Sequence, residues 1–398
     1  MNIQPNIGKT FKIITIITII ITIVLFAWGL THQSSEPQIF GRYSVGYVIL
    51  LLVLLAVPSL LIWTLRKGSQ KLIGAVVNAY LLIFSFVFTL GAVELGLRWF
   101  NPWGIEFFHI LPYHMQGMVD HPELGYTHPK SISYDLGKTQ VSLNSQGLRD
   151  EEVPYQKPVD ERRILVLGDS VTFGWGVDQH ETFSARMEPR LQKLTGERWQ
   201  VVNSGVNGYN TAQEAMYLSI EGLRYEPDIV IVVFVNNDVD PVFDPNQTTW
   251  RRYPSWPSSL PDLLNRALNL SYLYQSSKLF GRMHSDAKQD KRAQSITEHP
   301  GWKESFYALT KIAKLCESKG VELLVAKSSD STDSDFFQLL NASNIEVISL
   351  DPAWKEVEEG QQHVSRIDPH PSAAVHDRFA ERLVNELEVR GWLGEEGL

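Results

Sequence analysis

The chain has 398 residues, a formal net charge of −9 and a single cysteine. This length suffices for a membrane-embedded part and one sizeable domain, and the negative charge without a basic tract argues against nucleic-acid binding. One cysteine excludes an intramolecular disulfide, so we expect Cys316 to be a buried, unreactive thiol within a helix.

Three long apolar runs open the chain, at about residues 13–30, 43–65 and 72–97. Each approaches or exceeds the roughly 20 residues that a helix needs to cross the hydrocarbon core of a bilayer. Buried core helices are the alternative, but three successive runs without a polar face favour three N-terminal transmembrane helices. The first run could also be a cleaved signal peptide. No small-residue cleavage site follows Trp28-Gly29-Leu30, however, which favours an uncleaved anchor.

The basic residues predict the orientation of these helices. Two lysines precede the first run and three basic residues lie between the second and third, whereas the loop after the first run carries only Arg42. By the positive-inside rule, the N-terminus is cytoplasmic and everything after about Phe100 lies in a periplasm or outside the cell. Glu94 and Arg98 lie one helical turn apart near the outer end of the third run, and we expect them to pair. A functional role for this pair is the alternative.

Residues 101–160 are rich in Pro, Gly, His and aromatic residues, with short alternating pieces. We expect an irregular lead-in that packs on the following domain. Its histidines are expected to be surface or packing residues: His109, His114, His121 and His128.

From residue 161 to 398, strand-like and helix-like runs alternate. This pattern is typical of βαβ units and predicts an α/β fold with a mainly parallel sheet. Thr211 is expected to cap the N-terminus of a helix, with Glu214 completing a capping box. The expected strands are 164–167, 199–203, 229–235, 321–326 and 345–350, and the expected helices are 183–194, 211–223, 302–316 and 373–387.

An insertion at about 239–300 interrupts this alternation and is rich in Trp, Tyr, Pro and Arg. It includes an expected amphipathic helix at 260–279. Long excursions of this kind often form lids or substrate walls. A helix that simply packs against the sheet is an equal alternative.

Polar residues follow three of the expected strands. Ser170 comes after the first strand, where the carboxyl end of a parallel strand can expose a side chain to a ligand, although Gly-Asp-Ser could also be a simple turn. Gly208 follows the second strand, where a glycine lets a backbone N–H approach a bound oxygen or serves as an ordinary turn residue. Val235-Asn236-Asn237-Asp238 ends the third strand, and Asp368-Pro369-His370-Pro371 stands before the last helix.

These four blocks, in this order, resemble the SGNH hydrolase superfamily with its GDSL motif, over about residues 162–390. The resemblance implies a flavodoxin-like, three-layer α/β/α domain. It also implies that Ser170 is the nucleophile, His370 its general base and Asp368 the acid that orients the imidazole. The oxyanion hole would consist of the N–H groups of Ser170 and Gly208 and the side-chain amide of Asn237.

The chain departs from the family pattern in three places. Val171 is the fourth residue of the first block, and Val235 replaces the glycine of the third block, so that Asn236 remains an alternative to Asn237. The Asp–His spacing is the shorter variant, which leaves the role of Asp368 open. The fallback pair is His376 and Asp377. The stretch 144–150 (NSQGLRD) resembles a segment upstream of the first block in membrane-attached members, and no chemistry follows from it.

The first functional hypothesis is a membrane-anchored, extracytoplasmic serine esterase that acts on an ester or an acylated glycan or lipid, without a metal or other cofactor. The second is an O-acyltransferase that modifies a cell-envelope glycan with the same residues. Three spans are few for an acyl-donor channel, so a transferase would need a membrane partner that supplies the acyl group. Trp250, Tyr253 and Trp256 of the insertion could stack on sugar rings.

A non-catalytic binding module is the third hypothesis, against which the intact motifs argue. The natural substrate and the oligomeric state do not follow from the sequence.

Overall fold

The computed structural model describes residues 69–100, 117–136, 139–240, 301–328, 334–366 and 368–394, with His114, residues 271–274, Ser276 and scattered positions between 13 and 66. The chain divides into two compact units. One unit is Met1–Ile105 with Thr249–Ser285, and the other is Glu106–Thr248 with Asp286–Leu398.

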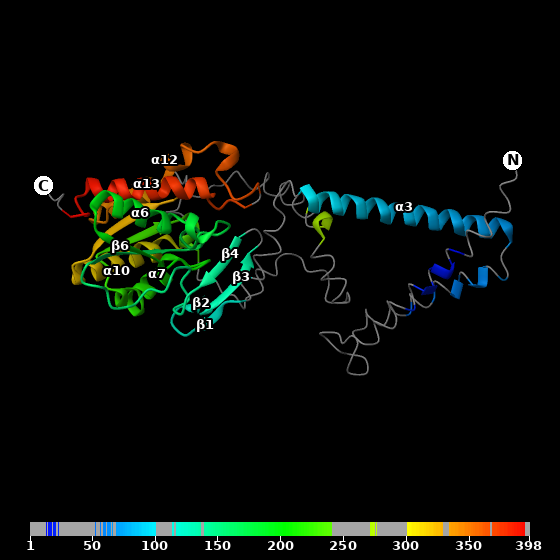
Figure 1. Ribbon diagram of the computed structural model, residues 1–398, viewed down its shortest axis with the longest axis horizontal. Coiled ribbons are helices and arrows are strands. Elements are labelled where there is room, and N and C mark those ends of the chain that lie inside the picture. Colours follow the sequence, from blue (N-terminus) through cyan, green and yellow to red (C-terminus); the bar gives the residue numbers. More distant parts are fainter. Residues whose placement is uncertain are drawn as a thin grey trace. The chain divides into compact units, whose positions relative to one another are not determined.

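A long apolar helix, α3 (Gln70–Phe100), dominates the described part of the first unit (Figure 1). Among the described residues, its segment Lys71–Phe100 is the one helix that is long and apolar enough to cross a membrane, judged by length and composition. Bulky side chains such as Leu82 and Phe86 are exposed along it. The third expected span is therefore helical, and this is weak support for membrane association. The spans expected at 13–30 and 43–65 lie largely outside the described residues.

Within the same unit, Glu94 binds the start of a helix in the insertion. Arg98 Nε donates to Glu94 Oε1 at 2.7 Å, so the expected pair is present. The Glu94 carboxylate also accepts from Ser271 Oγ at 2.9 Å and from the backbone N–H groups of Tyr272 and Leu273 at 2.9 and 2.8 Å. The helix begins at Tyr272 and Ser271 is not helical, so the expectation of one continuous helix over 260–279 is wrong at Ser271. Most of that range lies outside the described residues.

Two antiparallel hairpins lie in the segment that was expected to be irregular. Strand β1 (Val119–His121) pairs with β2 (Gly125–Thr127), and β3 (Ile132–Leu136) pairs with β4 (Thr139–Leu143). Buried and exposed residues alternate along β4. Alternation over five residues is typical of a half-buried strand, so the expectation of an irregular segment is wrong here.

The second unit is built on a sheet of five parallel strands, as expected. They are β5 (Glu161–Gly168), β6 (Arg198–Asn203), β7 (Ile229–Phe234), β8 (Glu322–Lys327) and β9 (Val347–Ser349). Their order is β6-β5-β7-β8-β9, which is that of a flavodoxin-like sheet. The predicted α/β fold class with a mainly parallel sheet is confirmed.

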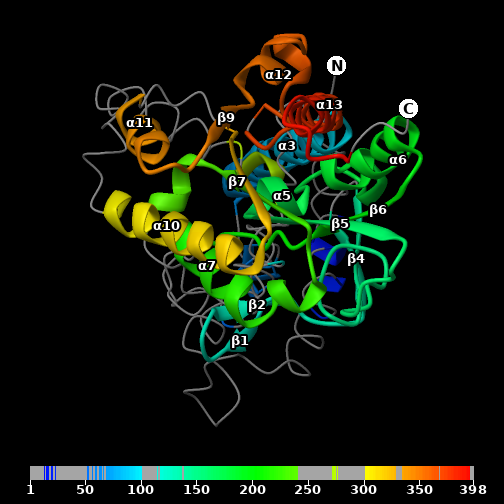
Figure 2. The same cartoon turned by 90° about the vertical axis from the view of Figure 1, so that its left-hand side faces the viewer.

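Helices cover both faces of this sheet (Figure 2). The helices α6 (Phe183–Thr195) and α13 (Ala373–Val389) contact each other on one face, and α7 (Thr211–Ile220) and α10 (Trp302–Lys319) do so on the other. Strand β7 is apolar throughout and β5 is apolar from Ile164 to Leu167, as is typical of strands buried on both faces. Shorter helices are α5 (Ser170–Phe173), α11 (Ser334–Ala342), α12 (Asp351–Lys355), η1 (Gln179–Glu181), η2 (Gly222–Tyr225), η3 (Asn236–Val239) and η6 (Glu359–Gln361).

The N-terminus of α7 is capped one residue earlier than expected. The Asn210 side chain accepts from Gln213 N at 3.0 Å, and Gln213 Oε1 accepts from Asn210 N at 3.2 Å. Asn210 has the extended backbone of an N-cap, whereas Thr211 is already the first helical residue. Glu214 is therefore no capping residue; its side chain points into the protein interior, where it is 1% exposed.

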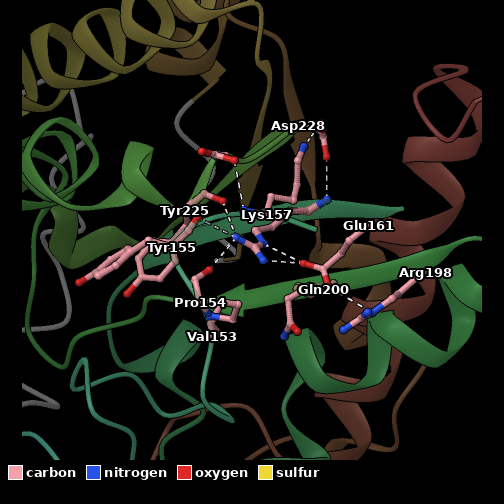
Figure 3. Close-up of polar contacts among 12 residues, drawn as sticks. Val153, Pro154, Tyr155, Lys157, Glu161, Arg198, Gln200, Tyr225 and Asp228 are labelled. Carbon is pink, nitrogen blue, oxygen red and sulfur yellow. Dashed lines mark hydrogen bonds and ion pairs between the residues drawn. The ribbon is translucent and has the colours of Figure 1, made fainter. Parts of the chain in front are cut away.

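A buried arginine network holds the beginning of β5 (Figure 3). Arg163 is fully buried and donates from Nε and Nη2 to Glu161 Oε1, at 3.1 and 2.5 Å. Its Nη1 donates to the carbonyl oxygens of Pro154, Tyr155 and Tyr225, at 3.0, 3.3 and 2.7 Å. One guanidinium thus joins the segment before β5 and the turn before β7 to the central strand.

Three polar blocks follow β5 and its two neighbours, β6 and β7, and therefore lie together at the carboxyl ends of these strands. The chain passes from β5 to β6 on one side and then to β7 on the other. In open α/β sheets, the carboxyl ends of the strands at such a switch point are where ligands bind. Ser170 follows β5, the Gly208 loop follows β6, and Asn237 follows β7.

Candidate active site

Ser170 is the first residue of α5, at the carboxyl end of β5. Asp169 caps this one-turn helix, since its Oδ1 accepts from Val171 N at 2.9 Å. The loop after β6 approaches the helix closely at Gly205, where an added Cβ would lie 2.3 Å from Phe173 N. This approach requires a glycine. It holds the segment Asp169–Gly174, which we call the nucleophile turn because it carries the candidate nucleophile Ser170, against the neighbouring loop.

The structure brings Ser170, His370 and Asp368 into one line of hydrogen bonds. His370 Nε2 lies 2.8 Å from Ser170 Oγ. His370 Nδ1 lies 2.5 Å from Asp368 Oδ1, which also accepts from the backbone N–H of His370 at 3.1 Å. Asp368 is 3% exposed, whereas the His370 side chain is 19% exposed. This geometry fits a serine hydroxyl whose proton an imidazole can take, with a carboxylate fixing the tautomer.

The short Asp–His spacing is accommodated by a tight loop before α13. His370 O accepts from Val364 N at 3.0 Å, and Ser372 Oγ donates to Gln361 O at 2.6 Å. Ser372 then begins α13 as its N-cap. The loop is therefore held from both sides of His370.

Asn237 reaches the nucleophile turn from the end of β7. Its Nδ2 donates to Asp169 Oδ2 at 3.1 Å, and Ser170 Oγ lies 3.2 Å from the same oxygen. Asp238 closes the Asn237 turn, since its Oδ2 accepts from Val235 N at 2.8 Å. Asn237 therefore contacts Asp169, the residue beside Ser170. Gly208 lies in the loop after β6 with a φ of 76°.

The fallback pair His376 and Asp377 does not form a site. His376 lies fully buried within α13, where its Nδ1 accepts from Phe183 N at 3.2 Å. Burial lowers its pKa to about 3. Asp377 instead pairs with Arg186 and Arg190, at 2.9 and 2.8 Å. This alternative is therefore wrong, because α13 turns the histidine into the core.

Two of the four scattered histidines are buried packing residues beside the candidate site. His114 Nε2 lies 2.6 Å from Asn207 Nδ2, and His114 Nδ1 lies 2.6 Å from the Tyr134 hydroxyl. Burial lowers the pKa of His114 to about 4 and that of His128 well below its usual value. Both rings are thus neutral, and the His114 ring can accept from Asn207 while donating to Tyr134. They support the loop that carries Gly208.

Four acidic side chains, of which Glu214 and Asp238 are buried and Asp150 and Glu188 half-buried, have no cationic partner in the described contacts of the domain. Burial raises the pKa of Asp150 to about 7 and also raises the pKa values of Glu188, Glu214 and Asp238. Within the described part of the chain, both carboxyl oxygens of Glu214 and Oδ1 of Asp238 lack a hydrogen-bond partner. Among the described residues, no group of three or more His, Cys, Asp or Glu side chains could hold a metal ion.

The raised pKa values of these carboxyls contribute a loss of stability as the pH rises, whereas the buried neutral histidines, with lowered pKa values, contribute a gain over the same range. The folded state keeps protons on these carboxyls at pH values where the unfolded chain, with values of 3.8 to 4.5, has released them. At these sites the folded state then binds more protons, so the contribution of the four carboxyls to the free energy of unfolding falls between about pH 4 and about pH 7. Each unit by which folding raises a pKa is worth about 1.4 kcal/mol.

Urea unfolding of the full-length protein in detergent, followed by tryptophan fluorescence at several pH values, measures this dependence. Glu214→Gln keeps the shape of the side chain but cannot ionise, so we expect the free energy of unfolding of the wild type, minus that of the variant, to fall from pH 4 to pH 7. A difference between the two proteins that stays constant or rises with pH would contradict the prediction.

Comparison with known proteins gives one family match. Residues 166–278 match the model of the GDSL-like Lipase/Acylhydrolase family. No curated protein sequence matches the chain. The fold is similar to a lipase/acylhydrolase from Enterococcus faecalis, with 16% identity, a TM-score of 0.35 and coverage of 57% of this chain and 96% of that one. It is also similar to the psychrotrophic esterase EstA from Pseudoalteromonas sp., with 14% identity, a TM-score of 0.34 and coverage of 57% and 99%.

Proposed function

We propose that the chain is a membrane-anchored serine esterase with its α/β domain outside the cytoplasm, and the match of residues 166–278 to the GDSL-like Lipase/Acylhydrolase family supports the hydrolysis of ester bonds. The observation that carries the proposal is the continuous line of hydrogen bonds from Asp368 through His370 to Ser170. A serine hydroxyl is a weak nucleophile unless a base takes its proton during attack.

In the proposed first step, Ser170 Oγ attacks the ester carbonyl while His370 Nε2 takes its proton. Asp368 keeps the Nδ1–H of the ring directed toward itself and stabilises the imidazolium that forms. The ring then protonates the departing alcohol, which leaves an acyl-serine. In the second step, His370 activates a water molecule that releases the acid and restores Ser170.

The proposed oxyanion hole uses the N–H groups of Ser170 and Gly208 and the amide of Asn237. The contact of Asn237 Nδ2 with Asp169 supports this, because it places the amide next to the nucleophile turn. Donors that are already in place stabilise the charge that develops on the carbonyl oxygen without reorganising. Asn237→Ala is the variant that isolates this contribution, about 100- to 1,000-fold in kcat.

The decisive test is hydrolysis of short-chain aryl esters by the full-length protein in detergent. Hydrolysis that depends on Ser170 supports the esterase. Labelling of Ser170 by a fluorophosphonate without hydrolysis, followed by acyl transfer once a sugar acceptor is added, would instead support an O-acyltransferase. A protein that shows neither labelling nor hydrolysis contradicts the proposed function.

The membrane part of the proposal rests on the apolar helix α3 and on the basic residues of the N-terminal loops. We propose three spans, at about 13–30, 43–65 and 72–97, with the N-terminus in the cytoplasm. A reporter enzyme that is active only outside the cytoplasm is expected to be active when fused after residue 398. The same reporter fused after Arg66 should be inactive, and the reverse pattern would overturn the orientation.

A further inference from the structure

The NSQGLRD stretch (144–150), to which the sequence assigns no chemical role, contacts the segment that follows Ser170. Its Arg149 is a long, charged side chain, and yet it is 1% exposed. Burial lowers its pKa to about 10, so it still carries its charge at neutral pH. A buried guanidinium is costly unless its N–H groups find acceptors, and the position of those acceptors is therefore informative.

The acceptors of Arg149 are four carbonyl oxygens, three between the last residue of α5 and Val177 and one, Gln140 O of β4, at 3.4 Å from Nη2. Nη1 donates to Phe173 O at 3.2 Å and to Gly174 O, and Nη2 donates to Val177 O at 2.6 Å. The guanidinium also lies 5.0 Å above the Phe173 ring. A one-turn helix leaves its last carbonyls without intrahelical donors. Arg149 supplies those donors and thereby holds the turn that follows the nucleophile.

That turn carries Trp175, which is 3% exposed and reaches across to Asp368. The Trp175 indole Nε1–H donates to Asp368 Oδ2 at 2.9 Å. The other oxygen, Oδ1, accepts from the ring and the backbone of His370. Because separate donors engage both oxygens, the carboxylate cannot rotate about its χ2 bond without breaking a hydrogen bond.

We propose that Trp175 and Arg149 are positioning residues for the catalytic acid: Arg149 holds the 174–177 turn, Trp175 projects from that turn, and its indole fixes the plane of the Asp368 carboxylate that orients His370. This inference rests on the proposed function, since it takes Asp368 as the acid of the triad. The segment that presents Ser170 then also orients His370, through the contact of Trp175 with Asp368.

A purely structural role would have a different signature. If Trp175 only filled space, its replacement would lower stability and leave the turnover of the folded protein unchanged. A positioning role lowers kcat with an unchanged KM, because the substrate binds as before while the base is misaligned. A misplacement of about 1 Å at a catalytic group can cost about 100-fold in rate.

The test compares two tryptophan-to-phenylalanine substitutions in the full-length protein in detergent. Trp175→Phe keeps an aromatic ring and removes the N–H that bonds Asp368. Trp199→Phe is the matched control, since Trp199 is 2% exposed and its indole donates to Thr195 Oγ1 at 2.9 Å, away from the site. We expect Trp175→Phe to lower kcat for an aryl ester and the rate of Ser170 labelling by a fluorophosphonate by about 10- to 100-fold, with KM unchanged. Trp199→Phe should leave both rates within about two-fold.

A double-mutant cycle shows whether Trp175 acts through Asp368. In an Asp368→Asn background, Trp175→Phe is expected to cause little further loss, because the group that it positions is gone. Arg149→Lys, which keeps the charge but not the fork of donors, should reproduce part of the Trp175→Phe defect. Full additivity in the cycle, or a Trp175→Phe protein with wild-type rates, overturns the inference while leaving the esterase intact. Absence of Ser170-dependent labelling in the wild type overturns the proposed function itself, and the inference with it.

Discussion

Replacing Ser170 with alanine is expected to lower kcat/KM for short-chain aryl esters by about 10⁴- to 10⁶-fold. The residue is the only member of the hydrogen-bonded line that can form the acyl intermediate, and His370 would then face a methyl group. Labelling by a fluorophosphonate should disappear in the same variant. The fold should persist, because the hydroxyl's contacts are with groups of the site: His370 Nε2 and Asp169 Oδ2.

The matched control is Ser219→Ala in α7. Ser219 is exposed, and its hydroxyl donates to Met216 O at 2.8 Å on its own helix. Activity and labelling should remain at the wild-type level in this variant. If Ser170→Ala retains hydrolysis above the background of the detergent solution, the nucleophile lies elsewhere and the proposed mechanism is wrong.

The largest expected effect on stability comes from Arg163→Met at the start of β5. The substitution keeps an apolar side chain of similar length and removes the donors to Glu161 and to the carbonyl oxygens of Pro154, Tyr155 and Tyr225. The buried Glu161 carboxylate then keeps only its contact with the surface residue Arg198, and breaking a buried ion pair in this way costs about 3 to 5 kcal/mol. Urea unfolding of the full-length protein in detergent, at pH 7, measures the loss.

Arg198→Met is the control, because Arg198 contacts the same carboxylate from the surface. Its Nε lies 3.2 Å from Glu161 Oε2, and its side chain is 59% exposed (Figure 3). Water screens such a pair, so we expect a loss below about 1 kcal/mol. Equal losses in the two variants would show that the buried network contributes no more than a surface pair.

The parts of the fold that the sequence predicts are those with strong local patterns. The apolar run at 229–235 became β7, and the alternation of strands and helices after residue 161 became a parallel sheet between helices. The candidate site follows from this, because the carboxyl ends of neighbouring parallel strands meet at one edge. Ser170 and Asn237 come from two such ends, and the Asp–His pair completes the line from the loop before α13. Their chemical roles remain predictions.

What the sequence does not predict depends on contacts through space. Asn210 and Thr211 are both acceptable helix caps, and only the backbone of the folded chain selects Asn210. Arg149 resembles a surface residue in sequence, because nothing local indicates that its acceptors lie at 173–177. Likewise, no spacing rule connects Trp175 with Asp368, which are 193 residues apart. The NSQGLRD stretch was the one feature of the sequence that drew attention to Arg149.

The distance of 200 residues along the chain between Ser170 and His370 affects when the protein can first act. A ribosome that adds about 5 to 20 residues per second needs about 10 to 40 s to proceed from one to the other. Strand β5 is complete when that interval begins and β6 is made early in it, so the proposed nucleophile exists for most of this time without the proposed base. Under the proposed mechanism, a newly translated copy cannot hydrolyse an ester until the loop with His370 docks against the sheet, and the gain of activity in a translation reaction reports completion of the fold.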